Sequence, residues 1–522
     1  MTKRLFPLSL ILVLPLLLGL ALISVGQTLA GSADICAATC TYSTIQDAVT
    51  NAPEGSTLTI AAETFSETVE IIRDITLIGA GSGATIIDAQ TADSVIWVHN
   101  GVMVSISGVT IQNGDTTDPN GGGGLLNEDG TVTLTNSIVQ NNLAYNGAGI
   151  SNLGTMTLDN VTVRNNVADD LVGEISICNV GCSGGGIYNE GTMTLTNSTI
   201  HGNSSLFGAG LDNNAGTLNA TSIEVYENTA ENNEESAGGG IENVGTMTLT
   251  NSTVRNNTAI WGAGLVNDGT MLVSGSDFYE NVAANSGGGM HNRFNLTVQT
   301  SNVYSNQAGS DGGGGMSSES GDVVVMQTAV YNNSATGSGG GIVHNVPAGS
   351  NSFIITNSTI SGNSTSGSGG GVGNAGVANT TLSNVTFHNN SSNIVAGQSV
   401  YVAAGTVSAA RTIFSITHSG TNCSGTITSQ GYNLISGSGC NANGSTDLAN
   451  TSALLGPLQN NGGSTLTHAL LLGSPAIDSG GSGCPAVDQR GVARPFGSAC
   501  DRGAYEYDEV VGFLYVPFLI RP

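Results

Sequence analysis

The sequence is poor in positive charge. Beyond residue 30 the chain has no Lys and nine Arg against 38 acidic residues, which gives a formal charge of −29. Such a surface repels nucleic acids and acidic polysaccharides, so a nucleic-acid partner is excluded. High net charge of one sign also keeps a protein soluble, and this simpler meaning stays open beside any binding role.

Long apolar runs are missing from all but the first residues. Lys3 and Arg4 precede an apolar run from Leu8 to Ser24, and Thr28-Leu29-Ala30 follows as a cleavage site. This order is typical of a signal peptide, so we expect residues 1–30 to be removed and the protein to be secreted or displayed at the cell surface. An uncleaved membrane anchor is the alternative, because the run is long enough to span a bilayer.

The apolar tail, residues 509–522, is too short to cross a membrane. We expect this tail to be a sorting signal or a last strand packed on the cap. The protein would therefore contact a membrane only through its signal or sorting segments. Helical periodicity is also scarce. Only Ser43 to Val49, with a capping-box pattern from Ser43 to Gln46, predicts a helix, which would cover the exposed end of the fold.

A repeated unit fills the middle of the chain. Residues 185–203 and 239–257 agree at 14 of 19 positions. Each unit has an apolar anchor in its last segment, at spacings of 24 to 37 residues. The anchors are Ile111, Val139, Val163, Ile200, Val225, Val254, Phe278, Val303, Val330, Ile360 and Phe387. Three residues after an anchor the residue is Asn in ten of eleven units, which shows that the period is real.

The signals within a unit are those of β-strands. Thr192-Met193-Thr194-Leu195 alternates, which predicts Met and Leu inside and Thr outside, and Gly or Asn ends each short segment. One coil cannot bury its own apolar residues, but stacked coils share a core and a backbone ladder. We expect the Asn residues to form a hydrogen-bonded ladder in the left-handed conformation at one corner, and Gly to form another corner. The regular apolar columns argue against disorder, the alternative for a chain with 76 Gly.

These repeats resemble the right-handed parallel β-helix of pectin-lyase-like proteins. The resemblance implies an all-β solenoid of about eleven regular coils in residues 101–410, a rod about 50 Å long at the strand spacing of a sheet. Residues 31–100 resemble the N-terminal cap and first coils of such proteins. The Gly-Gly-x-Ile segments, with Phe278 to Asn281 and Phe387 to Asn390, loosely resemble repeats of chlamydial polymorphic outer-membrane proteins.

Residues 411–508 have a different composition and predict a small disulfide-stapled module. They include Gly431-Tyr-Asn-Leu-Ile435, Asn461-Gly-Gly463, Ser474-Pro-Ala-Ile-Asp478, Asp488-Gln-Arg-Gly491 and Asp501-Arg-Gly-Ala-Tyr-Glu506. These motifs resemble the choice-of-anchor Q domain of bacterial surface proteins. We expect its charged residues to be salt-bridged structural groups rather than a catalytic set. They are Asp478, Asp488, Arg490, Arg494 and Asp501.

Eight cysteines fall into four local pairs, which are Cys36/Cys40, Cys178/Cys182, Cys423/Cys440 and Cys484/Cys500. An even number in an exported chain predicts disulfides. Metal binding is the alternative, and the lack of nearby His disfavours it.

One long interval, Val167 to Ser183, interrupts the repeat and holds Asp169, Asp170 and Glu174. Three carboxylates can hold Ca²⁺, but no Asp-x-Asp-x-Asp spacing is present, so a solvated loop is the favoured interpretation. No other cofactor is indicated.

A polar and aromatic column lies one residue after the anchors. Its members are Gln112, Gln140, Arg164, His201, Tyr226, Arg255, Tyr279, Tyr304, Tyr331, Ser361 and His388. Tyr279, Tyr304 and Tyr331 come from consecutive coils, so we expect their rings to stack about 5 Å apart. With Tyr226 they form a candidate binding stripe for sugars or a surface protein. Tyrosines that only stabilise strand faces are the alternative.

The resemblance to β-helix proteins also implies a possible enzyme, a polysaccharide lyase or glycoside hydrolase. Arg164 and Arg255 occupy a repeat position, whereas a catalytic site should break the repeat. His291-Asn292-Arg293 does break it, and no Asp is seen at a matching offset. Asp159, Asp212 and Asp277 share no demonstrable face, although carboxylate pairs for acid–base chemistry stay open. The sequence therefore favours a structural, adhesive or carbohydrate-binding protein over an enzyme.

Overall fold

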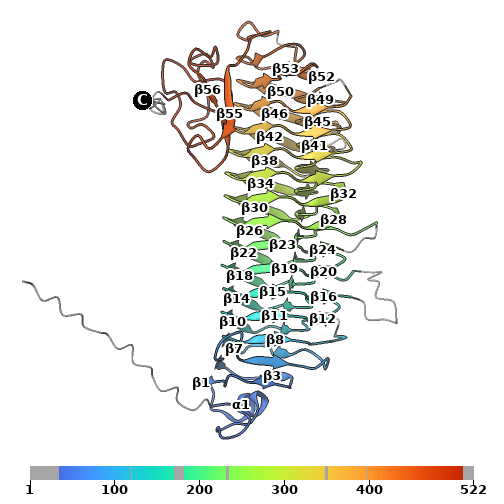
Figure 1. The fold of residues 1–522 in the computed structure, drawn as a ribbon, viewed down its shortest axis with the longest axis vertical. Coiled ribbons are helices and arrows are strands. Elements are labelled where there is room, and N and C mark those ends of the chain that lie inside the picture. The colour runs from blue at the N-terminus through green and yellow to red at the C-terminus, as the bar shows by residue number, and fades with distance from the viewer. Residues whose placement is uncertain are drawn as a thin grey trace, which may run out of the picture.

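The computed structural model describes residues 34–118, 120–169, 181–230, 234–346, 351–394, 397–441 and 443–508. Within them the chain winds into a rod of stacked coils, and a small module lies against its side near one end (Figure 1). The chain is a parallel β-helix, as predicted. The predicted signal peptide, residues 1–30, and the apolar tail, residues 509–522, lie outside the described residues. No helix in the described part of the chain is long and apolar enough to cross a membrane.

One coil crosses four parallel sheets in turn. It consists of β25 (Ile241–Asn243), β26 (Thr246–Thr250), β27 (Thr253–Arg255) and β28 (Thr258–Trp261). We call the sheet that contains β26 sheet 1, the sheet that contains β27 sheet 2, the sheet that contains β28 sheet 3 and the sheet that contains β25 sheet 4. Each strand pairs in register with its counterpart one coil away, as Thr246 does with Thr270. Residues at the same repeat position therefore become neighbours in space.

Sheet 1 has 15 strands, which are β1 (Ser56–Thr59), β4 (Ile75–Ile78), β7 (Met103–Ser107), β10 (Thr131–Thr135), β14 (Thr155–Asp159), β18 (Thr192–Thr196), β22 (Thr217–Thr221), β26, β30 (Thr270–Ser274), β34 (Asn295–Gln299), β38 (Val323–Met326), β42 (Ser352–Thr356), β46 (Asn379–Ser383), β50 (Val407–Ala410) and β53 (Ile427–Ser429). Sheet 2 also has 15, which are β2 (Thr64–Phe65), β5 (Ile86–Asp88), β8 (Thr110–Gln112), β11 (Ile138–Gln140), β15 (Thr162–Arg164), β19 (Thr199–His201), β23 (Glu224–Tyr226), β27, β31 (Asp277–Tyr279), β35 (Asn302–Tyr304), β39 (Ala329–Tyr331), β43 (Thr359–Ser361), β47 (Thr386–His388), β51 (Ile413–Ser415) and β54 (Leu434–Ile435).

Sheet 3 is the shortest, with β12 (Leu143–Ala144), β16 (Val167–Ala168), β20 (Ser204–Ser205), β24 (Thr229–Ala230), β28, β32 (Val282–Ser286), β36 (Gln307–Ala308), β40 (Ser334–Ala335), β44 (Ser364–Thr365) and β48 (Ser391–Ser392). Sheet 4 has β3 (Val69–Ile71), β6 (Ile96–Val98), β9 (Leu125–Asn127), β13 (Ile150–Asn152), β17 (Ile187–Asn189), β21 (Leu211–Asn213), β25, β29 (Leu265–Asn267), β33 (Met290–Asn292), β37 (Met316–Ser318), β41 (Ile342–His344), β45 (Val372–Asn374), β49 (Val400–Val402) and β52 (Cys423–Ser424).

The eleven predicted anchors all lie in sheet 2, in the eleven successive strands from β8 to β47. In β18 the side chains of Met193 and Leu195 are buried and those of Thr192 and Thr194 are exposed, as the alternation predicts. The inward residues of all coils form one continuous apolar cluster along the rod.

The corner between sheets 2 and 3 carries the predicted Asn ladder. From Asn142 to Asn390, each side chain donates from Nδ2 to Oδ1 of the Asn one coil further on, at 2.9–3.0 Å. The same Oδ1 also accepts from the backbone N–H of the preceding rung. The expectation that the ladder Asn is left-handed is wrong, because the left-handed residue is the one before it, such as Asn165 or Asn256, both with φ of 54°.

A second Asn ladder follows sheet 4 and was not predicted. Seven buried residues form six Nδ2-to-Oδ1 hydrogen bonds of 2.7–2.8 Å. They are Asn127, Asn152, Asn189, Asn213, Asn243, Asn267 and Asn292. The two ladders supply the polar groups of the corners with partners inside an otherwise apolar rod.

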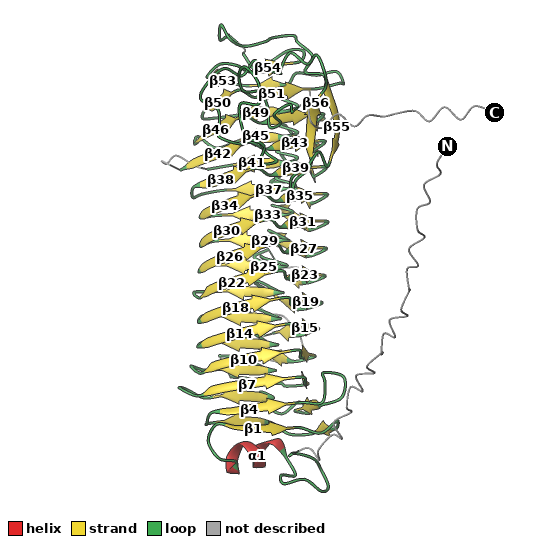
Figure 2. Cartoon of the chain, turned by 90° about the vertical axis from the view of Figure 1, so that its left-hand side faces the viewer, coloured by secondary structure: helices red, strands yellow, loops and turns green. Residues whose placement is uncertain are grey.

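A short helix, α1 (Ile45–Asn51), covers one end of the rod, shown in red in Figure 2. Its N-cap is Thr44, whose hydroxyl accepts from the backbone N–H of Asp47, rather than the predicted Ser43. The carboxylate of Glu67 accepts from the N–H groups of Ile45 and Gln46, so the first turn is also capped from a distant segment.

The other end of the chain folds back along the rod. The hairpin of β55 (Leu455–Gln459) and β56 (Thr467–Leu470) belongs to a unit that we call the side module, residues 455–508. Its two strands run antiparallel, whereas the strands of the four sheets run parallel.

Three of the four predicted disulfides are described at both cysteines. They join Cys36 to Cys40, Cys423 to Cys440 and Cys484 to Cys500. In the fourth predicted pair, Cys182 is fully buried and disulfide-bonded, within a small apolar cluster that includes Ala168 and Leu206. Its predicted partner, Cys178, lies outside the described residues, so the pairing of Cys182 with Cys178 stays a prediction.

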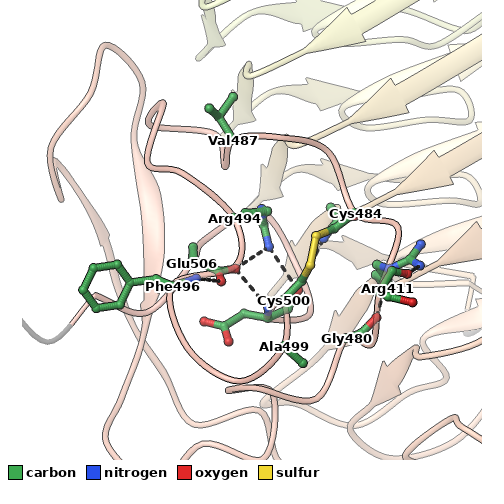
Figure 3. The surroundings of a disulfide bond; sticks show 12 residues. Arg411, Gly480, Cys484, Val487, Arg494, Phe496, Ala499, Cys500 and Glu506 are labelled. Carbon is green, nitrogen blue, oxygen red and sulfur yellow. Dashed lines mark hydrogen bonds and ion pairs between the residues drawn. A yellow bond between two sulfur atoms is a disulfide. The ribbon is translucent and has the colours of Figure 1, made fainter.

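Buried charged groups hold the side module together, beside the Cys484–Cys500 disulfide (Figure 3). Arg494 Nη1 lies 2.9 Å from Glu506 Oε2, and Arg490 Nη2 lies 2.8 Å from Asp488 Oδ2. Asp478 and Asp501 bind backbone N–H groups instead of arginines, since Asp501 Oδ1 accepts from the N–H of Asp478 at 2.7 Å. These charges staple loops that have little regular structure.

Candidate functional site

The predicted column lies along the outer face of sheet 2 as one continuous line of side chains. We call its uncovered part, from Gln112 to Tyr331, the outer column. At its start Gln140 Nε2 donates to Gln112 Oε1 at 2.8 Å, and Arg164 Nε donates to Gln140 Oε1 at 2.9 Å. In-register pairing places each member beside the member one coil away.

Aromatic rings continue the outer column. His201 stacks on Tyr226 with centroids 4.8 Å apart, and the Arg255 guanidinium lies 4.2 Å from the centre of the Tyr226 ring. Tyr279 stacks on Tyr304, and Tyr304 on Tyr331, each at 4.9 Å. The structure thus has the predicted stacking distance among the three consecutive tyrosines.

The stacking decides which atoms of the tyrosines can meet a ligand. The planes of Tyr304 and Tyr331 differ by only 2°, so the ring faces are turned toward each other. All three rings are half-buried. Ring edges and hydroxyl groups, rather than ring faces, are therefore presented to the solvent. Burial, with the nearby charge of Asp277, raises the pKa of Tyr304 to about 12, so its hydroxyl stays protonated at neutral pH and can donate a hydrogen bond.

The side module covers the last two positions of the predicted column. His468 Nε2 lies 2.9 Å from the hydroxyl of Ser361, and its ring meets the ring of His388 edge-on at 4.5 Å. The module reaches sheet 2 from beside β35 to beside β51 (Figure 2), through hydrogen bonds such as Thr359 Oγ1 to Gln489 Oε1 at 2.6 Å. The outer column therefore ends against a wall just beyond Tyr331.

The candidate catalytic residues are not assembled as an active site. Asp159, Asp212 and Asp277 lie in sheets 1, 4 and 2 respectively. Hydrogen bonds from Asn197 and Thr196 lower the pKa of Asp159. Arg293 is held by Asp268 through bonds of 2.7 and 2.8 Å, and Asn292 belongs to the second Asn ladder. The sequence reasoning missed Asp268, although it occupies the same repeat position as Arg293, one coil earlier.

A pair of buried carboxylates was also missed. Asp212 and Glu242 pair directly in adjacent strands of sheet 4 and are 3% and 6% exposed. Burial is the largest cause that raises both pKa values, that of Asp212 to about 7. The charge of Asp212 raises the pKa of Glu242 further. Such a pair keeps protons at a pH where exposed carboxyls have lost them.

The described residues hold no group of three or more His, Cys, Asp or Glu that could bind a metal ion. Of the three carboxylates considered for Ca²⁺ binding, Asp170 and Glu174 lie outside the described residues, and Asp169 is buried.

Comparison with known proteins gives structural likeness alone. No family model matches the chain, and no curated protein matches it. Pectate lyase Pel9A is similar at 16% identity and a TM-score of 0.38, over 79% of this chain and 89% of that chain. The A-module of the Azotobacter vinelandii mannuronan C-5 epimerase AlgE4 is similar at 14% identity and a TM-score of 0.31, over 72% and 91%. The AlgE6 A-module from the same organism gives 12% and 0.30, over 76% and 94%. Values this low carry no conclusion about activity, and the resemblances to the choice-of-anchor Q domain and to chlamydial repeats stay sequence-based expectations.

Proposed function

We propose that this protein is an exported β-helix rod, secreted or held at the cell surface, which binds polysaccharide along its outer column. The observation that carries the proposal is the unbroken line of hydrogen-bonding and aromatic side chains on sheet 2, with one member in every coil. A line of this kind suits a chain-like ligand that runs parallel to the rod. The role is adhesive or structural rather than catalytic.

The chemistry of the outer column favours a neutral or weakly charged glycan. The hydroxyls of Tyr279, Tyr304 and Tyr331 supply donors and acceptors at a one-coil spacing. The two arginines are already engaged, Arg164 by Gln140 and Arg255 by Tyr226. The formal charge of −29 for the chain after residue 30 repels acidic polymers.

Export is supported by the N-terminal sequence and by the cysteines. The described residues contain no free cysteine, and disulfides persist in oxidising surroundings. The resemblance of residues 411–508 to a choice-of-anchor domain adds a means of display. The alternative role, as a polysaccharide lyase or glycoside hydrolase, has no assembled set of candidate residues in the described part of the chain to support it.

A glycan array tests the proposal, with residues 31–522 as the probe, with and without Ca²⁺. We expect retention on a polysaccharide, and a loss of about tenfold in affinity for Tyr279→Ala and Tyr304→Ala, which corresponds to about 1.4 kcal/mol. Tyr304→Phe should lose nearly as much, because the hydroxyl rather than the ring face makes the contact. Tyr401→Ala is the matched control, since Tyr401 is half-buried in sheet 4.

Equal retention of the wild-type protein and both alanine variants would refute binding through the outer column. Release of unsaturated sugars, followed by ultraviolet absorbance, would refute the non-catalytic role.

A further inference from the structure

A polar cleft of about 240 Å³ opens over sheet 4, and it goes beyond the function proposed for sheet 2. We call it the serine cleft. Its floor is made by Ser317 and Val343, the central residues of β37 and β41, with Ser286 beside them. These three residues are 1–2% exposed, so the floor belongs to the rigid part of the rod.

Ser317 is the polar group of the floor. It is 2% exposed and lines the cleft. Its neighbours in register are His291 on one side and Val343 on the other. Its hydroxyl can both donate and accept a hydrogen bond.

Glycine lets the chain pass close to the floor. Gly313 has φ of 69°, and a Cβ at this position would lie 2.4 Å from the carbonyl oxygen of Met316 and 2.9 Å from Cγ1 of Val343. The segment that precedes each sheet-4 strand therefore folds tightly over the sheet. It brings Ser310, Asp311 and Ser338 up as one wall of the cleft.

The opposite wall comes from the turns that leave sheet 4. Glu319 and Asn345 line it. Glu319 Oε2 lies 3.7 Å from Nε2 of His291, whose ring nitrogens have no hydrogen-bond partner. Burial and Arg293 lower the pKa of His291 to about 3, so this histidine is neutral at pH 7. Burial raises the pKa of Glu319, and the charge of Arg293 opposes this shift.

The lining groups define the ligand by their chemistry. Carboxylates on opposite walls accept hydrogen bonds, while Ser and Asn side chains both donate and accept. Val343 offers a small apolar patch on the floor, as binding pockets for small molecules commonly do. No Lys or Arg lines the cleft, so a carboxylate, sulfate or phosphate would lie beside the carboxyl groups of Asp311 and Glu319 without a cationic partner in the lining.

We propose that the serine cleft binds a single neutral sugar ring, as a second and independent carbohydrate site on the rod. The hydroxyls of the sugar would donate to Asp311 and Glu319 and accept from Ser317 and Asn345. A sugar ring bound in the cleft contacts two opposite walls, whereas a polysaccharide chain on the outer column contacts only the edges of the tyrosine rings. The two sites lie on different sheets, so the loss of one leaves the other intact.

Ligand-observed saturation-transfer NMR on residues 31–522 tests this site, with galactose, glucose, mannose, glucosamine and galacturonate as probes. We expect at least one neutral hexose to bind. Glu319→Ala and Ser317→Val should each weaken it by about tenfold, because each removes a hydrogen-bonding group from the cleft. Ser338→Val, on the half-buried wall, replaces Ser317→Val if that variant does not fold.

One variant outside the cleft serves as the control. Glu280→Ala removes an exposed carboxylate and should leave the NMR signal unchanged. The proposal is overturned if no neutral hexose binds, if binding survives Glu319→Ala and the serine variant, or if galacturonate or glucosamine binds more tightly than every neutral hexose.

Discussion

Replacement of Asn257 by Ala in the first Asn ladder should destabilise the rod strongly. Asn257 Oδ1 accepts from the backbone N–H and from Nδ2 of Asn228, both at 3.0 Å. Its Nδ2 donates to the carbonyl of Val225 at 3.1 Å and to Oδ1 of Asn281 at 3.0 Å. Four hydrogen bonds are lost at a site that is 0% exposed. Because each hydrogen bond contributes about 1 kcal/mol, we expect the free energy of unfolding to fall by about 4 kcal/mol.

Urea-induced unfolding followed by circular dichroism measures this loss, and native-state hydrogen exchange locates it along the rod. Asn243→Ala, in the second ladder, should cost less, because two of the four hydrogen bonds of Asn243 are long, those from Nδ2 to the carbonyls of Gly245 and Thr270 at 3.3 and 3.4 Å. Thr248→Ala is the control on the outer face of β26, with an expected change within about 0.5 kcal/mol. A loss below about 1 kcal/mol for Asn257→Ala would refute the view that the ladder supports the corner.

Two further predictions concern buried charges. Arg494→Ala leaves the buried carboxylate of Glu506 without its arginine partner in the side module. We therefore expect the free energy of unfolding to fall by about 3–5 kcal/mol and a protease to cut residues 455–508 selectively. Uniform cleavage of the whole rod would contradict this expectation. Because burial raises the pKa of Asp212 from 3.8 to about 7, the folded state keeps a proton that the unfolded state releases. The stability from this group is complete below about pH 4 and is lost as the pH rises to about 7. Asp212→Asn should flatten that fall in the urea midpoint between pH 4 and 8, and an unchanged slope would show that Asp212 does not titrate in this way.

Sequence reasoning succeeded where position in the repeat decides the outcome. The strands stack in register, so two residues one period apart become neighbours without any further information. This is why the Tyr304–Tyr331 stack and the Asn ladder from Asn142 to Asn390 were predictable. The second ladder was equally visible, as the Asn three residues after a Gly that precedes Ile, Leu or Met in each unit from Asn127 to Asn292, but its position was not recognised.

The remaining features depend on side-chain burial or on long-range docking. Asp212 and Glu242 share a repeat position, yet only the structure shows that the Gly-rich segment covers them. The contact between His468 and Ser361 joins residues 107 positions apart, across a change from repeat to module. No periodicity predicts such a contact, because the packing of an irregular unit on the rod is not encoded in spacing.

The lateral attachment of the side module has a mechanical consequence. Most coils touch only the coils above and below, so a pull along the rod can peel them off one at a time. The side module instead bonds across the coils between β35 and β51, through Asn302, Gln327, Thr359, Asn384 and Arg411. Under tension these coils share the load through the module and yield together. A force applied at the C-terminal end of the rod would therefore act first on the coils that are most resistant to unravelling.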